Sequence, residues 1–215
     1  TDSFSDMGTN TLTVSVQSRG STRTLEEDDM YAMVEENAAY LDQCSPTVSM
    51  MGTVKIGTDT TSSSVTGVSE AYFAMMGYEV ASGRGIQYSA VAQRGKVCVV
   101  GAYVEQNLLG GDALGKTIKI GGVPYTVVGV LSQSGDTLTE GGRDDQVYIP
   151  YENALELMGA RYVTLYIFTS TSGETAAQAK EVIDSMLYDR FQGDTDAYFT
   201  QTMEEQANLI NAMMG

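Results

Sequence analysis

The segment 110–117 has the spacing of a phosphate-binding loop, G-x-x-x-x-G-K-T. In such a loop, backbone amides and the amino end of the following helix hold the phosphates, and the lysine, here Lys116, reaches the terminal ones. That chemistry requires a buried strand before the loop and a helix after it. Here residues 103–109 have helical spacing, and residues 117–120 alternate as a strand that runs into a Gly-Gly hairpin turn. We therefore predict no cofactor-binding residues: the glycines end a helix and begin a strand.

Two pairs of carboxylates stand close together in loops, Asp144 with Asp145 and Asp194 with Asp196. Such pairs bind Ca²⁺ or perform acid–base chemistry only with further oxygen ligands or a raised pKa. Neither pair lies in an EF-hand pattern. The Gly83-Arg84-Gly85 segment has two interpretations, a ligand-facing loop or a structural turn, and the turn is the commoner use of such residues. We predict no metal-binding residues.

The residues that could act as nucleophiles have no partner to activate them. The chain contains no histidine, so Ser45, Ser69 and Ser132 lack the usual base, and there is no G-x-S-x-G sequence. Cys98 lies in an apolar run and is interpreted as a small buried side chain, while Cys44 precedes a predicted strand. Whether these two cysteines form a disulfide stays open. We predict no catalytic residues and no enzyme activity.

The composition indicates a strongly acidic globular protein. Twelve basic and 28 acidic side chains give a formal net charge of −16 in 215 residues. A surface that negative repels nucleic acid and anionic lipid, so we exclude DNA and RNA as partners. No apolar run reaches the 18 or so residues that cross a bilayer, and the polar start does not read as a signal peptide. We expect the chain to be a segment of something longer.

The order of predicted elements repeats at the two ends of the chain. Each end reads as strand-helix-strand, and two such halves pair into a split β-α-β sheet with both helices on one face. The predicted elements are a strand at 11–16, a helix capped by Thr24, strands at 47–56 and 65–68, a strand at 162–168, a helix after a Thr171–Glu174 capping box, a strand at 196–200 and a helix at 202–214.

The middle of the chain has the pattern of an inserted, mostly β subdomain. Residues 97–131 read as strand, helix and hairpin, and Pro150 begins a helix that runs to about residue 158. Between them, the Gly-rich and acidic stretch 132–146 is expected to be an exposed, mobile loop. The predicted fold class is therefore α+β, with one subdomain made of 1–70 plus 160–215 and another made of 71–159.

Several short segments, in a fixed order along the chain, carry a family resemblance. These segments are TNTLTV at 9–14, VTGVS at 65–69 with Tyr72-Phe73, Gly83-Arg84-Gly85, VCVVG at 97–101, LLGG at 108–111, LGKTI at 114–118, YTVVGV at 125–130 and DQVYIPY at 145–151. With these segments the chain resembles the extracytoplasmic core domain of MacB-like ABC transporter permeases, a group that also contains FtsX-like permeases. The resemblance covers about nine-tenths of the chain, and it rests on the order and spacing of the segments together.

The resemblance implies a domain inserted between the first two transmembrane helices of a four-helix permease. Its two parts would be a "porter" subdomain made from both chain ends and a "sabre" subdomain inserted in the middle. The family has no catalytic residues here, so none is carried over. One departure is Leu109, where many members have Phe, and the transmembrane helices and the ATPase are not in this sequence.

The resemblance implies a non-catalytic module that couples cytoplasmic ATP hydrolysis to movement outside the membrane. Its partners would be a second permease subunit, the ABC ATPase, and an adaptor (membrane-fusion) protein or a peptide-like or lipidic substrate. One alternative is a signalling, FtsX-like permease domain that activates a cell-wall hydrolase or senses a peptide. Others are a stand-alone extracellular binding domain and, least favoured because the chain has no histidine, an extracellular enzyme. We expect the isolated chain to be a monomer, anchored in the full protein by flanking helices.

Overall fold

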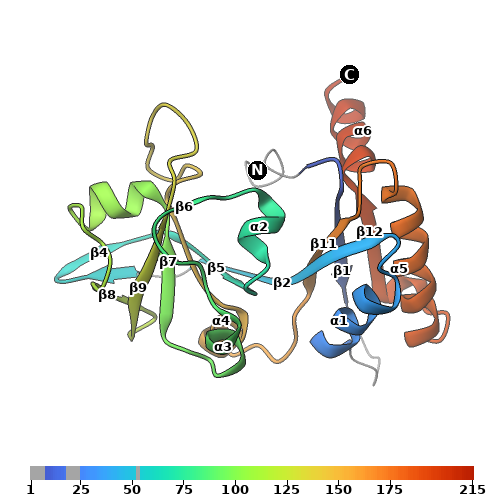
Figure 1. Ribbon diagram of the computed structural model, residues 1–215, viewed down its shortest axis with the longest axis horizontal. Coiled ribbons are helices and arrows are strands. Elements are labelled where there is room, and N and C mark those ends of the chain that lie inside the picture. Colours follow the sequence, from blue (N-terminus) through green and yellow to red (C-terminus); the bar gives the residue numbers. More distant parts are fainter. Residues whose placement is uncertain (1–7, 18–24, 52–53) are drawn as a thin grey trace. The chain divides into compact units, whose positions relative to one another are not determined.

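The chain folds into two compact units in this computed structural model, which describes residues 8–17, 25–51 and 54–215 (Figure 1). We call residues 47–161 the central unit, and residues 4–46 with 162–215 the terminal unit. The central unit begins at 47, whereas the sequence predicted an inserted segment from 71. The reason is that β3 (Val54–Ile56) and β5 (Ser64–Val68), which precede residue 71, pair with strands from the middle of the chain.

The terminal unit is an antiparallel sheet with helices, and it is assembled from both ends of the chain. Strand β1 lies between β11 and β12 and is antiparallel to both, in the order β12-β1-β11-β2. The two strand-helix-strand halves thus interleave, which confirms the predicted split β-α-β arrangement and the α+β class. The elements are β1 (Thr11–Val16), α1 (Glu27–Glu36), β2 (Leu41–Met51), β11 (Leu165–Ser170), α5 (Ala176–Arg190), η3 (Thr195–Ala197), β12 (Tyr198–Thr202) and α6 (Met203–Met214).

Helices α1 and α5 lie next to each other. Arg190 Nη2, at the end of α5, lies 3.2 Å from Asp29 Oδ2 in the first turn of α1, and Asn37 Nδ2 lies 3.7 Å from Met186 Sδ. The three acidic residues of the first turn of α1 also suit the positive end of the helix dipole. The unit buries apolar residues from both helices and the sheet, namely Leu12, Val14, Met30, Met33, Phe168, Ile183 and Leu187.

Several predicted boundaries in the terminal unit are wrong. The Thr24 cap lies outside the described residues, and α1 begins at Glu27, with the Glu26 amide donating to Asp29 Oδ2 at 3.0 Å. Strand β2 begins at Leu41, before the predicted start at 47, and Pro46 lies inside it. Pro46 precedes the register with β5, which starts at Val48, so its missing N–H breaks no bond of that ladder.

The two remaining helices of the terminal unit also differ from expectation. Helix α5 begins at Ala176 with Thr175 as its N-cap, and not at the predicted Thr171–Glu174 box. Helix α6 begins one residue later than the predicted 202, because Thr202 is its N-cap and its Oγ1 accepts from the Glu205 amide at 3.2 Å. Gln206 is the buried residue of this helix, while Leu209, Ile210, Met213 and Met214 are exposed. Among the described residues, no helix is long and apolar enough to span a membrane.

The central unit is built on a mixed sheet in the order β2-β5-β10-β7-β9-β8-β3-β4, with β6 paired to β9. Strands β5 and β10 are parallel, as are β7 and β9, and the other pairings are antiparallel. The elements are β3 (Val54–Ile56), β4 (Asp59–Thr61), β5 (Ser64–Val68), α2 (Tyr72–Met76), β6 (Val80–Gly83), α3 (Tyr88–Ala92), β7 (Val97–Val100), η2 (Val104–Leu108), β8 (Thr117–Ile120), β9 (Val123–Leu131), β10 (Gln146–Pro150) and α4 (Tyr151–Met158).

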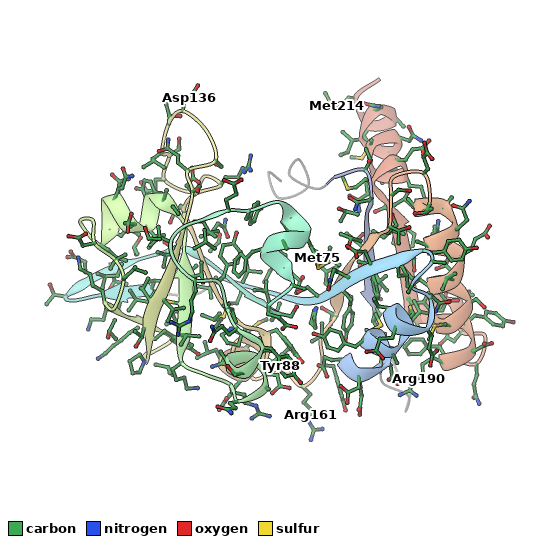
Figure 2. The ribbon with its side chains drawn as sticks, viewed as in Figure 1. Met75, Tyr88, Asp136, Arg161, Arg190 and Met214 are labelled. Atoms are coloured by element: carbon green, nitrogen blue, oxygen red, sulfur yellow. The ribbon has the colours of Figure 1, made fainter. Side chains whose placement is uncertain are left out.

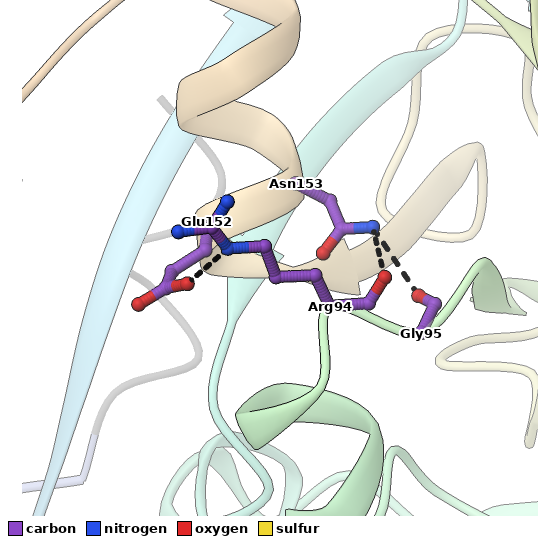
Figure 3. Close-up of polar contacts among 4 residues, drawn as sticks. All are labelled: Arg94, Gly95, Glu152 and Asn153. Atoms are coloured by element: carbon purple, nitrogen blue, oxygen red, sulfur yellow. Dashed lines mark hydrogen bonds and ion pairs between the residues drawn. The ribbon is translucent and has the colours of Figure 1, made fainter.

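Helix α4 begins after Pro150, as predicted, and is fixed to the turn that follows α3 (Figure 3). The buried Asn153 amide donates to the carbonyl oxygens of Arg94 and Gly95 at 3.2 and 3.3 Å. Arg94 Nε lies 2.7 Å from Glu152 Oε2 at the surface. Helix α3 has five residues and is not among the predicted elements. This turn therefore ties a predicted helix to one that sequence reasoning missed.

Two glycines of the central unit lie where backbones approach closely. A Cβ at Gly129 in β9 would overlap the carbonyl oxygen of Arg84, and a Cβ at Gly101 would overlap that of Asp144. Only glycine leaves room for such contacts. Gly83 and Arg84 also pair with β9, since the Arg84 amide donates to the Val128 carbonyl at 2.9 Å. The Gly83-Arg84-Gly85 segment is thus part of the sheet edge.

Candidate functional site

The lysine of the G-x-x-x-x-G-K-T sequence is engaged with the chain's own backbone. Lys116 Nζ donates to the carbonyl oxygens of Leu109 and Gly111 at 2.7 and 2.8 Å. Leu109 is the C-cap residue of η2, a π-helical turn in which the Leu109 amide donates to the Val104 carbonyl, and Gly111 lies two residues further along the chain. Helix η2 precedes the glycines and β8 follows them, the order expected from sequence and the reverse of that in a phosphate-binding loop. Lys116 therefore caps a helix end here.

The paired carboxylates of residues 144 and 145 are buried and hold the ends of the loop between β9 and β10. Asp144 accepts from the Ser134 amide at 2.9 Å and from the Ser134 hydroxyl at 3.0 Å. Asp145 accepts from Ser63 Oγ at 2.7 Å and from the Gly141 amide at 2.9 Å. The loop is exposed over most of 132–143, as predicted, but its last two acidic side chains are not. Figure 2 shows Asp136 at its outer end.

The other candidate side chains have structural surroundings. Asp194 accepts from the Asp196 amide at 3.1 Å and so caps η3. Ser45 is buried and donates to the Pro46 carbonyl at 2.8 Å. Ser69 is also buried. In the part of the chain that the structure describes, no group of three or more acidic, cysteine or histidine side chains could hold a metal ion.

Cys44 and Cys98 are free thiols, and both are buried. Burial disfavours the thiolate, so it raises the pKa of Cys98 to about 12 and also raises the pKa of Cys44. A thiol nucleophile or metal ligand acts as the thiolate. Neither cysteine therefore has the environment of a reactive thiol, which agrees with the interpretation of Cys98 as a small apolar side chain.

A cleft of about 230 Å³ opens in the central unit beside the β9–β10 loop. It is lined by residues 77–79 after α2, Gly101 after β7, residues 131–134 after β9, residues 143–144, and Tyr148 of β10. Sequence reasoning missed it, because the lining comes from five separate segments and the spacing within each segment is unremarkable. The indication that the sequence does carry is its content of 13 tyrosines.

The floor of the cleft belongs to a cluster of aromatic rings. Tyr148 lies 5.2 Å from Phe73, 5.8 Å from Tyr72 and 6.4 Å from Tyr78, measured between ring centroids. The Phe73 and Tyr148 rings meet edge to face, the geometry that aromatic pairs prefer. The rings of Tyr72 and Phe73 come from α2, so this helix and β10 together fix the positions of the aromatic side chains that face the cleft.

The chain matches the family model described as the MacB-like periplasmic core domain over residues 1–186. It is 27% identical over 215 residues to the macrolide export ATP-binding/permease protein MacB of Chromobacterium violaceum, and 30% identical over 225 residues to that of Bordetella avium. These matches cover 96% and 99% of this chain but only 32% and 34% of the relatives. The chain thus spans about a third of the length of the curated relatives it matches.

Solved structures show the same fold. The periplasmic region of MacB from Actinobacillus actinomycetemcomitans matches with a TM-score of 0.76 at 20% identity, covering 97% of this chain and 95% of that one. The extracellular domain of the noncanonic ABC-type transporter YknZ from Gram-positive bacteria matches with a TM-score of 0.72 at 16% identity, covering 90% of this chain and 100% of that one. The chain therefore belongs to the family of MacB-like periplasmic core domains, the extracytoplasmic domains of MacB-like ABC transporter permeases.

Proposed function

We propose that this domain is a non-catalytic module that couples ATP hydrolysis in the cytoplasm to movement outside the membrane. The observation that carries the proposal is the interrupted chain path: residues 4–46 and 162–215 form one unit, and residues 47–161 form another between them. Helices that flank residues 1 and 215 would both act on the terminal unit. We assign the porter role to the terminal unit and the sabre role to the central unit.

The partners follow from the same proposal. The curated relatives are ATP-binding/permease proteins about three times as long as this chain, so the ATPase and the membrane helices would belong to the full-length protein. A second permease subunit would form the working pair. An adaptor protein, or a peptide-like or lipidic substrate, would contact the exposed surfaces of this domain. Export or mechanical work would then be driven by rigid-body motion of the units.

Spin labels on the full-length protein would test the coupling. The native thiols at 44 and 98 are buried, so a cysteine introduced at the exposed Leu114 of the central unit, or at Tyr188 of the terminal unit, would be labelled selectively. In a pair of permease subunits in nanodiscs, pulsed EPR reports the label-to-label distance. We expect this distance to differ between the nucleotide-free and ATP-bound states.

The control is the same labelled protein with an inactivated ATPase that still binds ATP. Its label-to-label distance should remain at the ATP-bound value and should not return to the nucleotide-free value. If the distances at both labelled positions stayed constant while the protein hydrolysed ATP and transported substrate, the proposed coupling through this domain would be wrong. A stable pair with no movement would instead favour a static binding role.

A further inference from the structure

The cleft lies at one end of a parallel pair of strands. Strands β7 and β9 run parallel from the Val97–Thr126 pair to the Val100–Val130 pair. Gly101 directly follows β7 and residues 132–134 directly follow β9, and both line the cleft. In open α/β sheets, ligands bind outside the carboxyl ends of parallel strands. The sheet of the central unit is mixed, and the cleft lies at the carboxyl ends of one of its two parallel pairs.

The size of the cleft limits what it can hold. An engineered apolar cavity of about 150 Å³ holds benzene. At about 230 Å³, the cleft has room for one ring with a short substituent. Tyr148, one of the lining residues, is 4% exposed and is held by contacts with Tyr72 and Phe73, so the aromatic surface that it contributes is small and fixed. Tyr78, half-buried, forms a second aromatic wall.

The charges around the cleft favour a cation. Two acidic side chains, Glu79 and Asp144, and one basic side chain, Arg143, line it. Their formal charges sum to −1, in a chain whose net charge is −16. Asp144 is buried and already accepts two hydrogen bonds from Ser134, whereas Glu79 is exposed. Tyrosine ring faces also attract cations.

We propose that this cleft binds a small organic cation, an apolar ring that carries a positively charged amine. The ring would lie against Tyr148 and Tyr78, and the amine would lie near the Glu79 carboxylate. The site goes beyond the coupling role and does not depend on it, because binding involves only the central unit. A negative result in the coupling experiment would not contradict the proposed cation site. A negative result in the binding experiment would not contradict the proposed coupling.

The probe for this site is benzyltrimethylammonium, titrated into the 215-residue chain and followed by amide chemical shifts. Equivalent regions of relatives have been solved as separate chains, so the domain can be studied alone. We expect saturable shifts at Gly101, at residues 132–134 and at Asp144, with a dissociation constant of about 1 mM or below. Phenylacetate, an anion of similar size, should bind at least about tenfold more weakly.

Three variants make the test specific. Glu79→Gln should weaken binding of the cation by about three- to tenfold and leave binding of neutral benzyl alcohol unchanged. Glu140→Gln removes the same charge from the exposed loop, outside the cleft lining. This variant should change neither the affinity for the cation nor the affinity for benzyl alcohol. Tyr78→Ala should weaken all ring ligands. Tyr78 packs in the aromatic cluster, so its loss also affects stability, and the exposed Glu79 keeps the test decisive.

Three results would contradict the proposed cation site. Shifts scattered over the acidic surface, without saturation at the cleft, would show general attraction of cations to the chain. Phenylacetate binding as tightly as benzyltrimethylammonium would show that the charge assignment is wrong. Equal effects of Glu79→Gln and Glu140→Gln would show that Glu79 has no local role.

Discussion

The Ser63 hydroxyl donates to Asp145 Oδ1 at 2.7 Å, and both side chains are buried. This bond joins the start of β5 to the end of the β9–β10 loop, 82 residues away in sequence. A hydrogen bond to a buried charged group contributes about 1.5–3 kcal/mol, and a buried group that loses its partner is costly. The pair therefore stabilises the loop end as well as the sheet.

Replacing either partner should lower the free energy of unfolding. We expect Ser63→Ala and Asp145→Ala each to cost about 1–3 kcal/mol, with a coupling energy above about 1 kcal/mol in a double-mutant cycle. Urea denaturation of the isolated chain measures these values. Asp136→Ala, at the exposed end of the same loop, is the control and should stay within about 0.5 kcal/mol. Additive effects of the two substitutions would contradict a direct interaction.

Gly129→Ala should destabilise the central unit strongly. The new methyl group would overlap the Arg84 carbonyl oxygen, so β6 and β9 would have to separate. We expect a loss of at least about 2 kcal/mol, measured as a shift in the urea midpoint. Gly135→Ala is the matched control, because no atom lies within 4 Å of its added Cβ. A neutral Gly129→Ala would mean that this close approach is not maintained in solution.

Lys116→Met should affect stability and not nucleotide binding. The variant loses both hydrogen bonds to the end of η2, so we expect a cost of about 1–2 kcal/mol. Lys119→Met, exposed on β8, should cost less than about 0.5 kcal/mol. Calorimetric titration with Mg-ATP should give no binding heat for the unmodified chain. Micromolar ATP binding that Lys116→Met abolished would restore the phosphate-loop interpretation.

The two buried thiols should make stability fall at alkaline pH. The pKa of Cys98 rises from an ordinary value of 9.0 to about 12 on folding, and that of Cys44 also rises. The unfolded chain therefore releases these protons first. Their contribution to stability is complete below pH 9 and is lost as the pH rises toward 12. Replacing both cysteines by alanine should reduce the loss of unfolding free energy at alkaline pH only in part, because burial also raises the pKa of Tyr166.

The isolated chain should be a monomer. In the full-length protein, the membrane helices and the ATPase would impose the pairing of subunits. Light scattering at micromolar concentration measures the mass directly. The exposed apolar residues near the end of α6, Ile210 and Met213 among them, are the places where self-association would begin. A stable dimer that Ile210→Ser and Met213→Ser dissolved would contradict the prediction and identify the surface.

Sequence periodicity correctly predicted the type and position of most elements that have a strong local pattern. The alternation of β1, the apolar run of β7 and the Pro150 start of α4 were predicted and are observed. Strand β6 was missed, because its mostly exposed residues carry no apolar alternation and it forms by pairing with β9. The strand predicted from 47 begins at Leu41 and includes Pro46, which breaks no bond with β5 because that pairing begins only at Val48.

The candidate site depended on long-range packing and could not be read from the sequence. Tyr78 and Tyr148 are 70 residues apart, and only the folding of α2 against β10 brings their rings within 6.4 Å. The acidic pair at 144–145 was correctly assigned to a loop, but its burial follows from hydrogen bonds to Ser134 and Ser63. Local spacing identifies such side chains as polar and does not say which residues they contact.

The β9–β10 loop is held by hydrogen bonds at both of its ends, so changes at its tip have little effect on the sheet. Asp144 and Asp145 hold the base of the loop, so the residues between Ser134 and Gly141 can change in length or composition with little effect on the strands below. Substitutions and insertions in such a loop can create new contacts during evolution without destabilising the fold. It also offers the experimenter a site for an epitope tag or a fluorophore that leaves the rest of the domain undisturbed.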